Sequence, residues 1–533
     1  MYNLDVYIAW FRKNIYRNTS IERFVKFNST LVSKTDSNHA EKIALFELHV
    51  SMTTYLLYSF ICQFKRKSNI KLIGYRPIRN RRKMENFAFF IFSKFNLDNG
   101  VFRPFRILRS MKICKFIQPR NMGKYKSLAT QVLNQINKDD KENLLNLELN
   151  GIRIGDILYD WHLREHSLDT VDFNSSDFEN DFQIFVCSFY WWCDYFEGNR
   201  VDSVFVSHTV YQQAITVRIG LYFGVDVFLV GNDRLYHLNN DKKWSDIEFL
   251  DYEPNSAEQF GYQVDLNRAK LELKKLRSGN GTTAAHAYAS GYIGEEVKNI
   301  IKDEKAINIL IACHCFSDAP HANGDMLFPD FREWLNFIGK LSIKTSYHFY
   351  AKAHPYFWES DKLHYKDFLD KNPNIIEVSS SFSNLELFRQ GINVVLTIHG
   401  TIAFEAAYEG ILVINASLNS PHVNYNFSLS PSSITEFRDI ILNLPNIIPS
   451  WKVNTEEVEH FFDLHHLRRN RNILFLENTK VLYNDIGGYD QQFTNPKVFD
   501  IWLNNFSEFE SEMLAKRIEN FLMSDSYFLH ELE

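Results

Sequence analysis

Long apolar runs are absent from this chain of 533 residues. The most apolar early run, residues 50–64 (VSMTTYLLYSFICQF), is shorter than the ~20 residues that span a bilayer, and it contains Ser, Thr and Gln. We therefore expect a buried helix there. The first residues, MYNLDVYIAWFRKN, lack the apolar centre of a signal peptide. These features favour a cytoplasmic protein whose association with a membrane, where it occurs, is peripheral.

Cysteine is also scarce. The six cysteines are scattered and form neither a disulfide framework nor a zinc knuckle. This pattern favours a reducing compartment. Internal repeats and low-complexity runs are missing as well. Because one hydrophobic core rarely supports a chain of this length, we expect two domains with appendages.

Acidic residues are rare at one end of the chain. Residues 1–130 hold 25 Lys and Arg but 7 Asp and Glu, a net charge of +18, whereas the remainder carries −24. Such a split indicates an anionic partner for the basic region, either a membrane surface or a polyanionic glycan. A solvated basic face is the alternative, and nucleic acid is not expected because no recognition motif is present. The candidate membrane contacts form one basic loop: Arg76, Arg79, Arg81, Arg82 and Lys83.

Short apolar strands alternate with amphipathic helices along much of the chain. Strands are expected at 71–75, 113–117, 201–207, 225–230, 306–312, 347–353 and 375–378, whereas residues 1–60 are expected to be helical. This order predicts an α/β protein with two Rossmann-like, doubly wound domains facing a cleft. We expect an N-terminal domain at 1–281 with a basic helical start, a second domain at 282–480, and C-terminal helices at 481–533 that pack back.

One stretch, residues 394–416 (VVLTIHGTIAFEAAYEGILVINA), predicts a buried strand, a turn, a short helix and a second buried strand. The turn is His399-Gly400-Thr401, and Glu405 lies on the helix. Free N–H groups at a helix start favour an anion, so this turn is a candidate phosphate site. Glu405 can accept hydrogen bonds from ribose hydroxyls. The alternative is a packing unit whose Glu faces solvent.

A second candidate element precedes it by one strand–helix unit. Lys352 and His354 lie at the end of an expected strand, and Pro355 stops that strand. A cation and an imidazole at this place suit a donor phosphate and can stabilise charge on a leaving group. The alternative is a surface Lys and a capping His.

Histidines follow several expected strands: His208, His314, His354 and His399. His314 opens a loop, residues 314–330, that is rich in His, Asp and Gly. We interpret it first as a substrate or catalytic loop, because polar loops at strand ends often carry function. A metal site on His314, Asp318, His321 and Asp325 is the second interpretation, and a plain structured loop the third.

An acceptor hydroxyl must give its proton to a base, and carboxylates and imidazoles are the candidate bases. Asp156 and Asp160 are spaced to share one helical face, and His208 follows a strand. Helix-surface carboxylates and a helix-capping His are equally reasonable interpretations.

The motifs GIRIGDILYD, VSHTVY, HCFSDAPH…LFPDF, KAHP and TIHGTIAFEAAYEGILVINAS resemble those of bacterial capsule and O-antigen polysaccharide glycosyltransferases of GT-B fold. The resemblance covers roughly residues 150–430, and the KAHP and helix-start elements are similar to those of polysialic acid and Kdo transferases, which use CMP-sugars. It implies an acceptor-binding N-terminal domain, a nucleotide-sugar-binding second domain, and catalysis in the cleft without a metal. By motif, Lys352 and His354 would contact the donor phosphate. His399, Gly400, Thr401 and Glu405 would form the second nucleotide element.

The leading hypothesis is therefore a glycosyltransferase that moves a sugar from a nucleotide-activated donor, preferably a CMP-sugar, to a surface polysaccharide or lipid-linked glycan. The nucleotide sugar is a co-substrate, and no other cofactor and no metal are expected. The alternatives are a metal-dependent hydrolase or phosphotransferase centred on residues 314–325, and a non-catalytic glycan- or nucleotide-binding protein.

Overall fold

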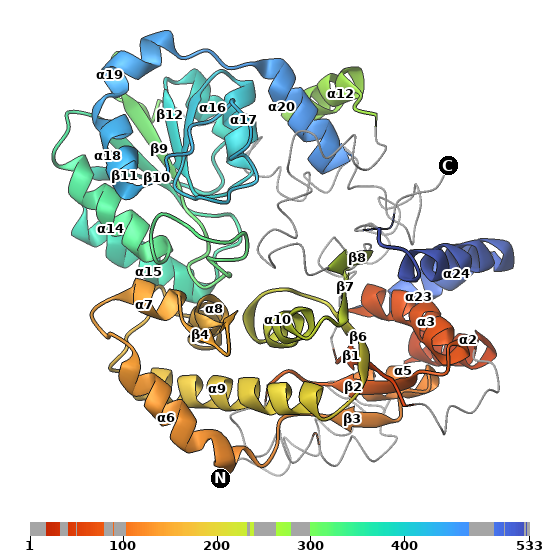
Figure 1. The fold of residues 1–533 in the computed structure, drawn as a ribbon. Helices are drawn as coiled ribbons and strands as arrows, with labels where there is room; N and C mark the ends of the chain where they lie inside the picture. Colours follow the sequence, from red (N-terminus) through yellow and green to blue (C-terminus); the bar gives the residue numbers. More distant parts are fainter. Residues whose placement is uncertain are drawn as a thin grey trace, which may run out of the picture.

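The computed structural model describes residues 18–31, 41–48, 51–78, 89, 103–231, 235–238, 263–278, 299–467, 495–505, 507–526 and 529. These residues form two α/β domains, drawn one above the other in Figure 1. Each domain is built on its own sheet. No helix in these ranges is long and apolar enough to cross a bilayer.

The first domain is built on a six-stranded sheet of order β3-β2-β1-β6-β7-β8. Neighbouring strands are parallel except for the antiparallel pair β7 and β8. The strands are β1 (Ile43–Glu47), β2 (Lys71–Tyr75), β3 (Lys115–Ile117), β6 (Val201–Val206), β7 (Asp226–Val230) and β8 (Leu235–Leu238).

Helices cover both faces of this sheet because its strands bury side chains alternately on each side. Leu45 and Val204 point into one core, whereas Phe46 and Phe205 point into the other. The first core contains α6 (Lys126–Gln135), α8 (Gly155–His166), α9 (Ser176–Glu197) and α10 (Ala214–Tyr222). The second contains α2 (Thr19–Leu31), α3 (Met52–Lys67), α5 (Arg103–Ser110), α23 (Lys497–Asn505) and α24 (Glu508–Leu522).

The second domain has a five-stranded sheet, all parallel, of order β11-β10-β9-β12-β13. The strands are β9 (Asn308–Ala312), β10 (His348–Lys352), β11 (Ile375–Val378), β12 (Val394–Thr397) and β13 (Leu412–Asn415). One face packs on α14 (Phe331–Ser342), α15 (Glu359–Lys371) and α18 (Ile434–Leu442). The other packs on α12 (Leu266–Arg277), α16 (Asn384–Arg389), α17 (Ile402–Tyr408) and α20 (Thr455–Phe462).

Shorter elements complete the described chain. They are η2 (Met122–Tyr125), α7 (Lys141–Leu145), β4 (Glu148–Leu149), β5 (Ile152–Arg153), η3 (Tyr211–Gln213), α19 (Leu444–Ile447), η7 (Ile448–Ser450) and the π-helix η8 (Asp463–Leu467). The strands β4 and β5 form a small antiparallel hairpin just before α8.

The predicted fold class is confirmed: two doubly wound, Rossmann-like domains, a GT-B-like layout, with helices added at both ends. The buried helix expected at residues 50–64 is α3. The helical reading of residues 1–60 is wrong at β1, which lies in the middle of the first sheet. This run of five residues, all buried, is too short for its period to separate strand from helix.

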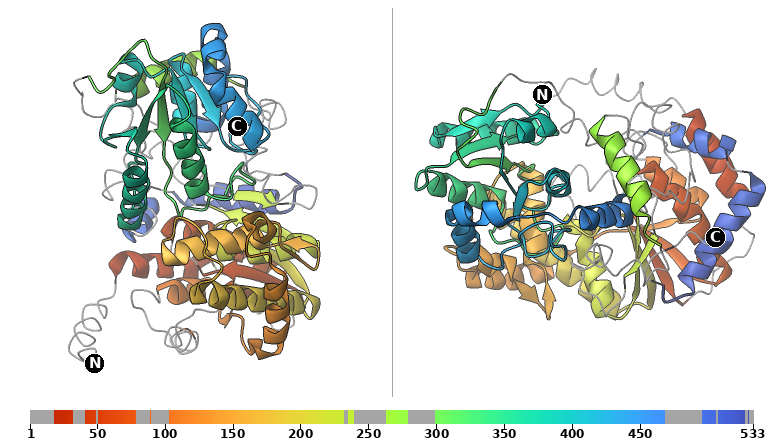
Figure 2. Two further views of the ribbon diagram at one scale, coloured as in Figure 1. Left: turned by 90° about the vertical axis from the view of Figure 1, so that its left-hand side faces the viewer. Right: turned by 90° about the horizontal axis from the view of Figure 1, so that it is seen from above.

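The chain passes between the domains before residue 281, at which the first domain was expected to end. Ala269, Leu273 and Leu276 on α12 are buried in the second domain, and Figure 1 shows α12 next to α20. The left-hand view in Figure 2 again shows the second domain above the first. The C-terminal helices α23 and α24 return to the first domain, where Phe499 stacks on Phe24 of α2 with ring centroids 4.0 Å apart.

Candidate active site

A pocket opens in the second domain where β9, β10 and β12 end. Its empty volume, including the part open to solvent, is about 630 Å³. Ligands of doubly wound domains bind at the carboxyl ends of the strands. The lining residues are Ala312, Cys313, His314, Lys352, Ala353, His354, Pro355, Asn384, Thr397, Gly400, Thr401, Ile402 and Glu405.

At the floor of the pocket, the side-chain amide of Asn384 lies between a buried cation, Lys352, and a buried acid, Glu405. Lys352 Nζ donates to Phe382 O and to Asn384 Oδ1, each at 2.5 Å. Asn384 Nδ2 lies 3.5 Å from Glu405 Oε2. Burial lowers the pKa of Lys352 to about 8, although Glu405 opposes the shift. Burial raises the pKa of Glu405 to about 7. Near neutral pH, Lys352 therefore brings positive charge to the pocket.

His354 is held in one tautomer by its neighbours. Its Nδ1 accepts the backbone N–H of Tyr356 at 3.2 Å, and the Cys315 Sγ lies 3.5 Å from the same nitrogen. Burial lowers the pKa of His354, so the imidazole is neutral at pH 7. A neutral ring that accepts at Nδ1 carries its proton on Nε2. His354 is thus set to donate a hydrogen bond to a ligand oxygen.

His314 lines the pocket and His399 lies directly behind it. The two ring centroids are 4.7 Å apart. His314 Nε2 accepts the N–H of Ile398 at 3.3 Å and lies 3.2 Å from Thr397 Oγ1. Burial lowers the pKa of His314 well below its usual value and that of His399 to about 4. Both imidazoles are therefore neutral.

The turn before α17 is a weaker candidate for a phosphate site than its sequence suggests. The helix has 7 residues, too few for a strong dipole, and the Gly400 N–H already donates to Thr397 Oγ1 at 3.3 Å. A Cβ on Gly400 would lie 2.9 Å from that oxygen and 3.4 Å from His314 Cε1. Gly400 therefore matters for close packing beside His314, while the phosphate role of His399, Gly400 and Thr401 stays a prediction.

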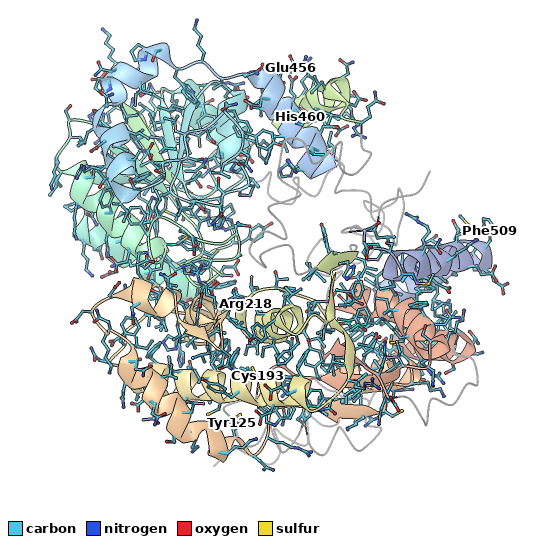
Figure 3. The ribbon with its side chains drawn as sticks, in the orientation of Figure 1. Tyr125, Cys193, Arg218, Glu456, His460 and Phe509 are labelled. Atoms are coloured by element: carbon cyan, nitrogen blue, oxygen red, sulfur yellow. The ribbon has the colours of Figure 1, made fainter. Side chains whose placement is uncertain are left out.

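Asp156 is placed where it cannot easily act as a base. It lies in a buried bidentate pair with Arg218 of α10, both oxygen-to-nitrogen distances being 2.6 Å; Figure 3 labels Arg218 inside the first domain. Burial opposes the negative charge, but Arg218 outweighs it and the pKa of Asp156 is lowered. The structure therefore argues against the base role considered for Asp156 and gives it a structural one.

Asp160 also has a fixed partner. Its Oδ1 lies 2.7 Å from His321 Nδ1, and its Oδ2 accepts the backbone N–H of His321 at 3.1 Å. Both side chains are buried where α8 meets the loop 314–330. Burial alone would lower the pKa of His321, but Asp160 raises it. This pair joins the two domains, and neither residue lines the pocket.

The loop 314–330 does not gather its polar residues into one centre. Asp318 accepts from Tyr211 OH at 3.1 Å, and Asp325 pairs with Arg153 at 2.6 Å. His314 faces the pocket, whereas His321 turns to Asp160. The one group with metal-ligand geometry in the described ranges lies elsewhere, on α8 and α9. These placements disfavour a metal centre at residues 314–325.

His208 is exposed on the first domain, just after β6. Its Nδ1 lies 2.5 Å from Ser207 O, and since a carbonyl only accepts, Nδ1 carries a proton. Ser207 is fixed in turn by Glu47 of β1, which accepts its N–H at 2.8 Å and its hydroxyl at 2.7 Å. The neighbouring Tyr211 contacts Asp318, so this loop faces the second domain.

Sequence reasoning missed Asn384, Thr397 and Glu47. Asn384 follows β11 in a Ser-rich stretch, SSSFSN, and Thr397 ends a buried strand, so position at a strand end was the available signal.

The basic loop is described only in part. The guanidinium of Arg76 lies over the Phe89 ring, 4.9 Å from its centroid, whereas Arg79, Arg81, Arg82 and Lys83 lie outside the described residues.

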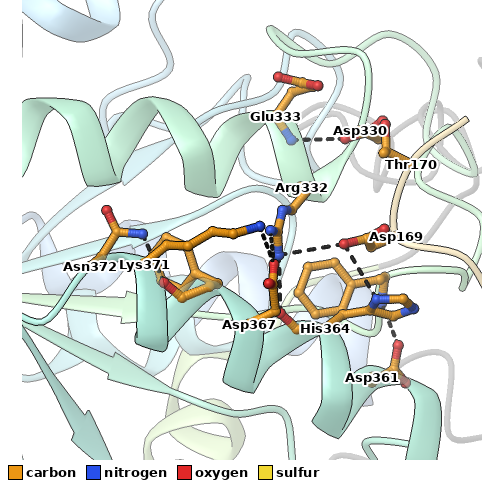
Figure 4. A network of polar contacts seen from close by, with 12 residues as sticks. Asp169, Thr170, Asp330, Arg332, Glu333, Asp361, His364, Asp367, Lys371 and Asn372 are labelled. Atoms are coloured by element: carbon orange, nitrogen blue, oxygen red, sulfur yellow. Dashed lines mark hydrogen bonds and ion pairs between the residues drawn. The ribbon is translucent and has the colours of Figure 1, made fainter. Parts of the chain in front are cut away.

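The domains are also joined by a polar network at the far end of α8 (Figure 4). Asp330 accepts from Tyr159 OH at 2.5 Å and from Thr170 Oγ1 at 2.6 Å. Asp169 lies 3.4 Å from both Arg332 and His364. These contacts hold the second domain against the first.

No family model matches the chain, and no curated protein matches it. Solved structures do show a likeness. UDP-GlcNAc 2-epimerase from Neisseria meningitidis bound to UDP-GlcNAc has 11% identity, covering 79% of this chain and 96% of that one, with a TM-score of 0.26. MurG from Acinetobacter baumannii has 8% identity, 79% and 94% coverage and a TM-score of 0.22. The wall teichoic acid polymerase TagF has 10% identity, 94% coverage of each chain and a TM-score of 0.21.

Likenesses at this level identify neither a family nor a function. The class that the chain's own topology and pocket define is a two-domain α/β protein of GT-B-like layout, with a polar ligand pocket in its second domain.

Proposed function

We propose that the chain is a GT-B-type glycosyltransferase that moves a sugar from a nucleotide-activated donor to a glycan. The observation that carries this proposal is the pocket at the ends of β9, β10 and β12. It offers one buried cation, Lys352, a neutral N–H donor, His354, and a buried acid, Glu405. These three kinds of group can hold a phosphate with an adjoining ribose.

In the proposed reaction, Lys352 and the Nε2–H of His354 bind the donor phosphate. They stabilise the negative charge that grows on the phosphate as its bond to the sugar carbon breaks. Glu405 accepts hydrogen bonds from the ribose hydroxyls. The acceptor hydroxyl forms the new bond to the sugar carbon and gives its proton to a base.

The hydrogen bonding of its ring favours His208 as this base. Its Nδ1–H is directed to Ser207 O, so Nε2 is the proton-accepting nitrogen, and its loop faces the second domain through Tyr211. This choice departs from Asp156, which Arg218 already holds. Because the charge on the leaving phosphate is met by Lys352 and His354, the proposed transfer uses no metal.

The finer features rest on the sequence. The motif resemblance suggests a CMP-sugar as donor and a capsule or O-antigen polysaccharide or a lipid-linked glycan as acceptor. The scattered cysteines and the missing signal-peptide pattern suggest a cytoplasmic location, and the basic N-terminal region suggests peripheral attachment to the inner membrane.

The test is a thermal-shift series with CMP, CDP, UDP and GDP, followed by release of nucleotide from the matching sugar donors, since ligand binding raises the midpoint of unfolding. One nucleotide should raise Tm, and His354→Ala and Glu405→Ala should each abolish most of that rise. Glu386→Ala, on the neighbouring helix α16 but outside the pocket lining, serves as the matched control. Unchanged nucleotide binding and turnover in both pocket variants would refute the proposal.

A non-catalytic binding protein remains the competing function, because the same pocket could hold a nucleotide without reaction. Binding of a nucleotide with no turnover of any sugar donor would favour it. A loss of turnover in His208→Ala, with the thermal shift retained, would exclude it.

A further inference from the structure

Two histidines and one aspartate meet inside the first domain, away from the pocket. His162 and His166 are one turn apart on α8, and Asp181 lies opposite them on α9. His162 Nδ1 is 2.8 Å and His166 Nε2 is 3.0 Å from the same Asp181 oxygen, Oδ2. The side chains of His162 and Asp181 are completely buried, and that of His166 is 16% exposed.

The donor atoms have the spacing of a metal site. One atom from each side chain lies within 4.8 Å of the others. Tetrahedral ligands at about 2.0–2.1 Å from Zn²⁺ are about 3.3 Å apart, so a small outward movement of the imidazoles would admit an ion. Imidazole ligands favour zinc over magnesium or calcium. The single carboxylate then offsets part of the ion's charge.

A further carboxylate stands where metal-bound histidines usually have one. His166 Nδ1, on the far side of the ring from Asp181, lies 3.8 Å from Asp177 Oδ2. A carboxylate that accepts a hydrogen bond from the second ring nitrogen of a metal-bound His fixes the ring orientation and strengthens the ligand. At 3.8 Å, Asp177 faces that nitrogen from just beyond direct hydrogen-bond distance. Asp177 belongs to the first turn of α9, so the whole group comes from two packed helices.

We propose that His162, His166 and Asp181 bind one Zn²⁺ that fastens α8 to α9, with water as the fourth ligand on the exposed side of His166. The metal is structural and takes no part in sugar transfer. Directly after His166, Ser167 O accepts from His364 Nε2 of the second domain at 3.0 Å. The site therefore supports the segment through which α8 meets the second domain.

The test uses full-length, tag-free protein stripped with a chelator and dialysed. Zn²⁺ alone is then added, and bound metal is counted by elemental analysis after gel filtration. We expect one tightly bound Zn²⁺ per chain and a rise in Tm of at least about 2 °C. Substitution with Co²⁺ should give the visible absorption of a tetrahedral site. His166→Ala should weaken Zn²⁺ binding by more than about tenfold and remove the rise in Tm.

A matched control keeps the proposal falsifiable. His237 also contacts an aspartate, Asp226 at 3.1 Å, but it belongs to no group of three metal-ligating side chains in the described residues. His237→Ala should leave Zn²⁺ binding intact. Because Asp181→Asn alters a fully buried group and could prevent folding, His166→Ala carries the test. No bound zinc in the wild type, or the same zinc binding in His166→Ala, would overturn the proposal.

Discussion

Removing the carboxylate of Asp156 should destabilise the protein rather than stop its chemistry. Asp156 and Arg218 are almost completely buried, and two contacts of 2.6 Å join them. In Asp156→Ala the guanidinium stays buried and keeps Arg153 O as an acceptor at 2.5 Å. Breaking one side of a buried pair costs about 3–5 kcal/mol. For a domain of this size, about 2–4 °C is lost per kcal/mol, so Tm should fall by roughly 6–20 °C.

The assay compares thermal unfolding with turnover measured well below Tm. Asp156→Ala should keep turnover within about tenfold of the wild type, whereas loss of a general base costs about 10²–10⁴-fold. The double variant Asp156→Leu with Arg218→Met should be more stable than the single variant, because apolar replacement of a buried pair is often neutral. Glu165→Ala, a change at an exposed carboxylate on the same helix α8, is the control. An unchanged Tm with lost turnover would refute the reasoning and restore Asp156 as base.

Three further outcomes are expected. Nucleotide affinity should fall as pH rises through about 8, where Lys352 loses the proton that binds phosphate, and Lys352→Arg should remove that fall; titration calorimetry from pH 6.5 to 9.5 checks both. Gly400→Ala should weaken nucleotide binding and also lower Tm, since its Cβ would crowd the buried Thr397 Oγ1, and equal affinity in a thermal-shift titration would contradict this. Tyr159→Phe should cost about 1–3 kcal/mol by removing a donor from the buried Asp330, and a denaturant midpoint equal to the wild type would count against it.

The sheets were largely predictable from sequence because buried parallel strands are continuous apolar runs. NILIA at β9, VVLT at β12 and LVIN at β13 have this character, each with one polar residue at an end of the strand. The strand β1 was not predicted, since its five residues adjoin the long apolar helix α3 and lack a turn signal of their own. Of the two strands that pair with β1, β2 follows α3, but β6 lies far along the chain.

The pocket residues were partly predictable for a related reason. Lys352 and His354 end a strand, and parallel strands bring their carboxyl ends to one edge. Contacts between residues far apart in sequence could not be predicted. Asn384 lies 32 residues beyond its partner Lys352, and Arg218 lies 62 residues beyond its partner Asp156. A solvated carboxylate and a buried ion pair have the same local sequence, so only the folded chain separates them.

The return of the C-terminal helices to the first domain has a consequence for how the two domains stay joined. Trp502 and Leu514 are buried beside α2 and α3, so both ends of the described chain belong to the first domain. In sequence, the second domain is therefore inserted into the first, between β8, which ends at Leu238, and α23, which begins at Lys497. An inserted domain is covalently linked to its host at both of its ends. One proteolytic cut between the domains should therefore leave them covalently joined, whereas domains that follow each other in series would separate into two pieces.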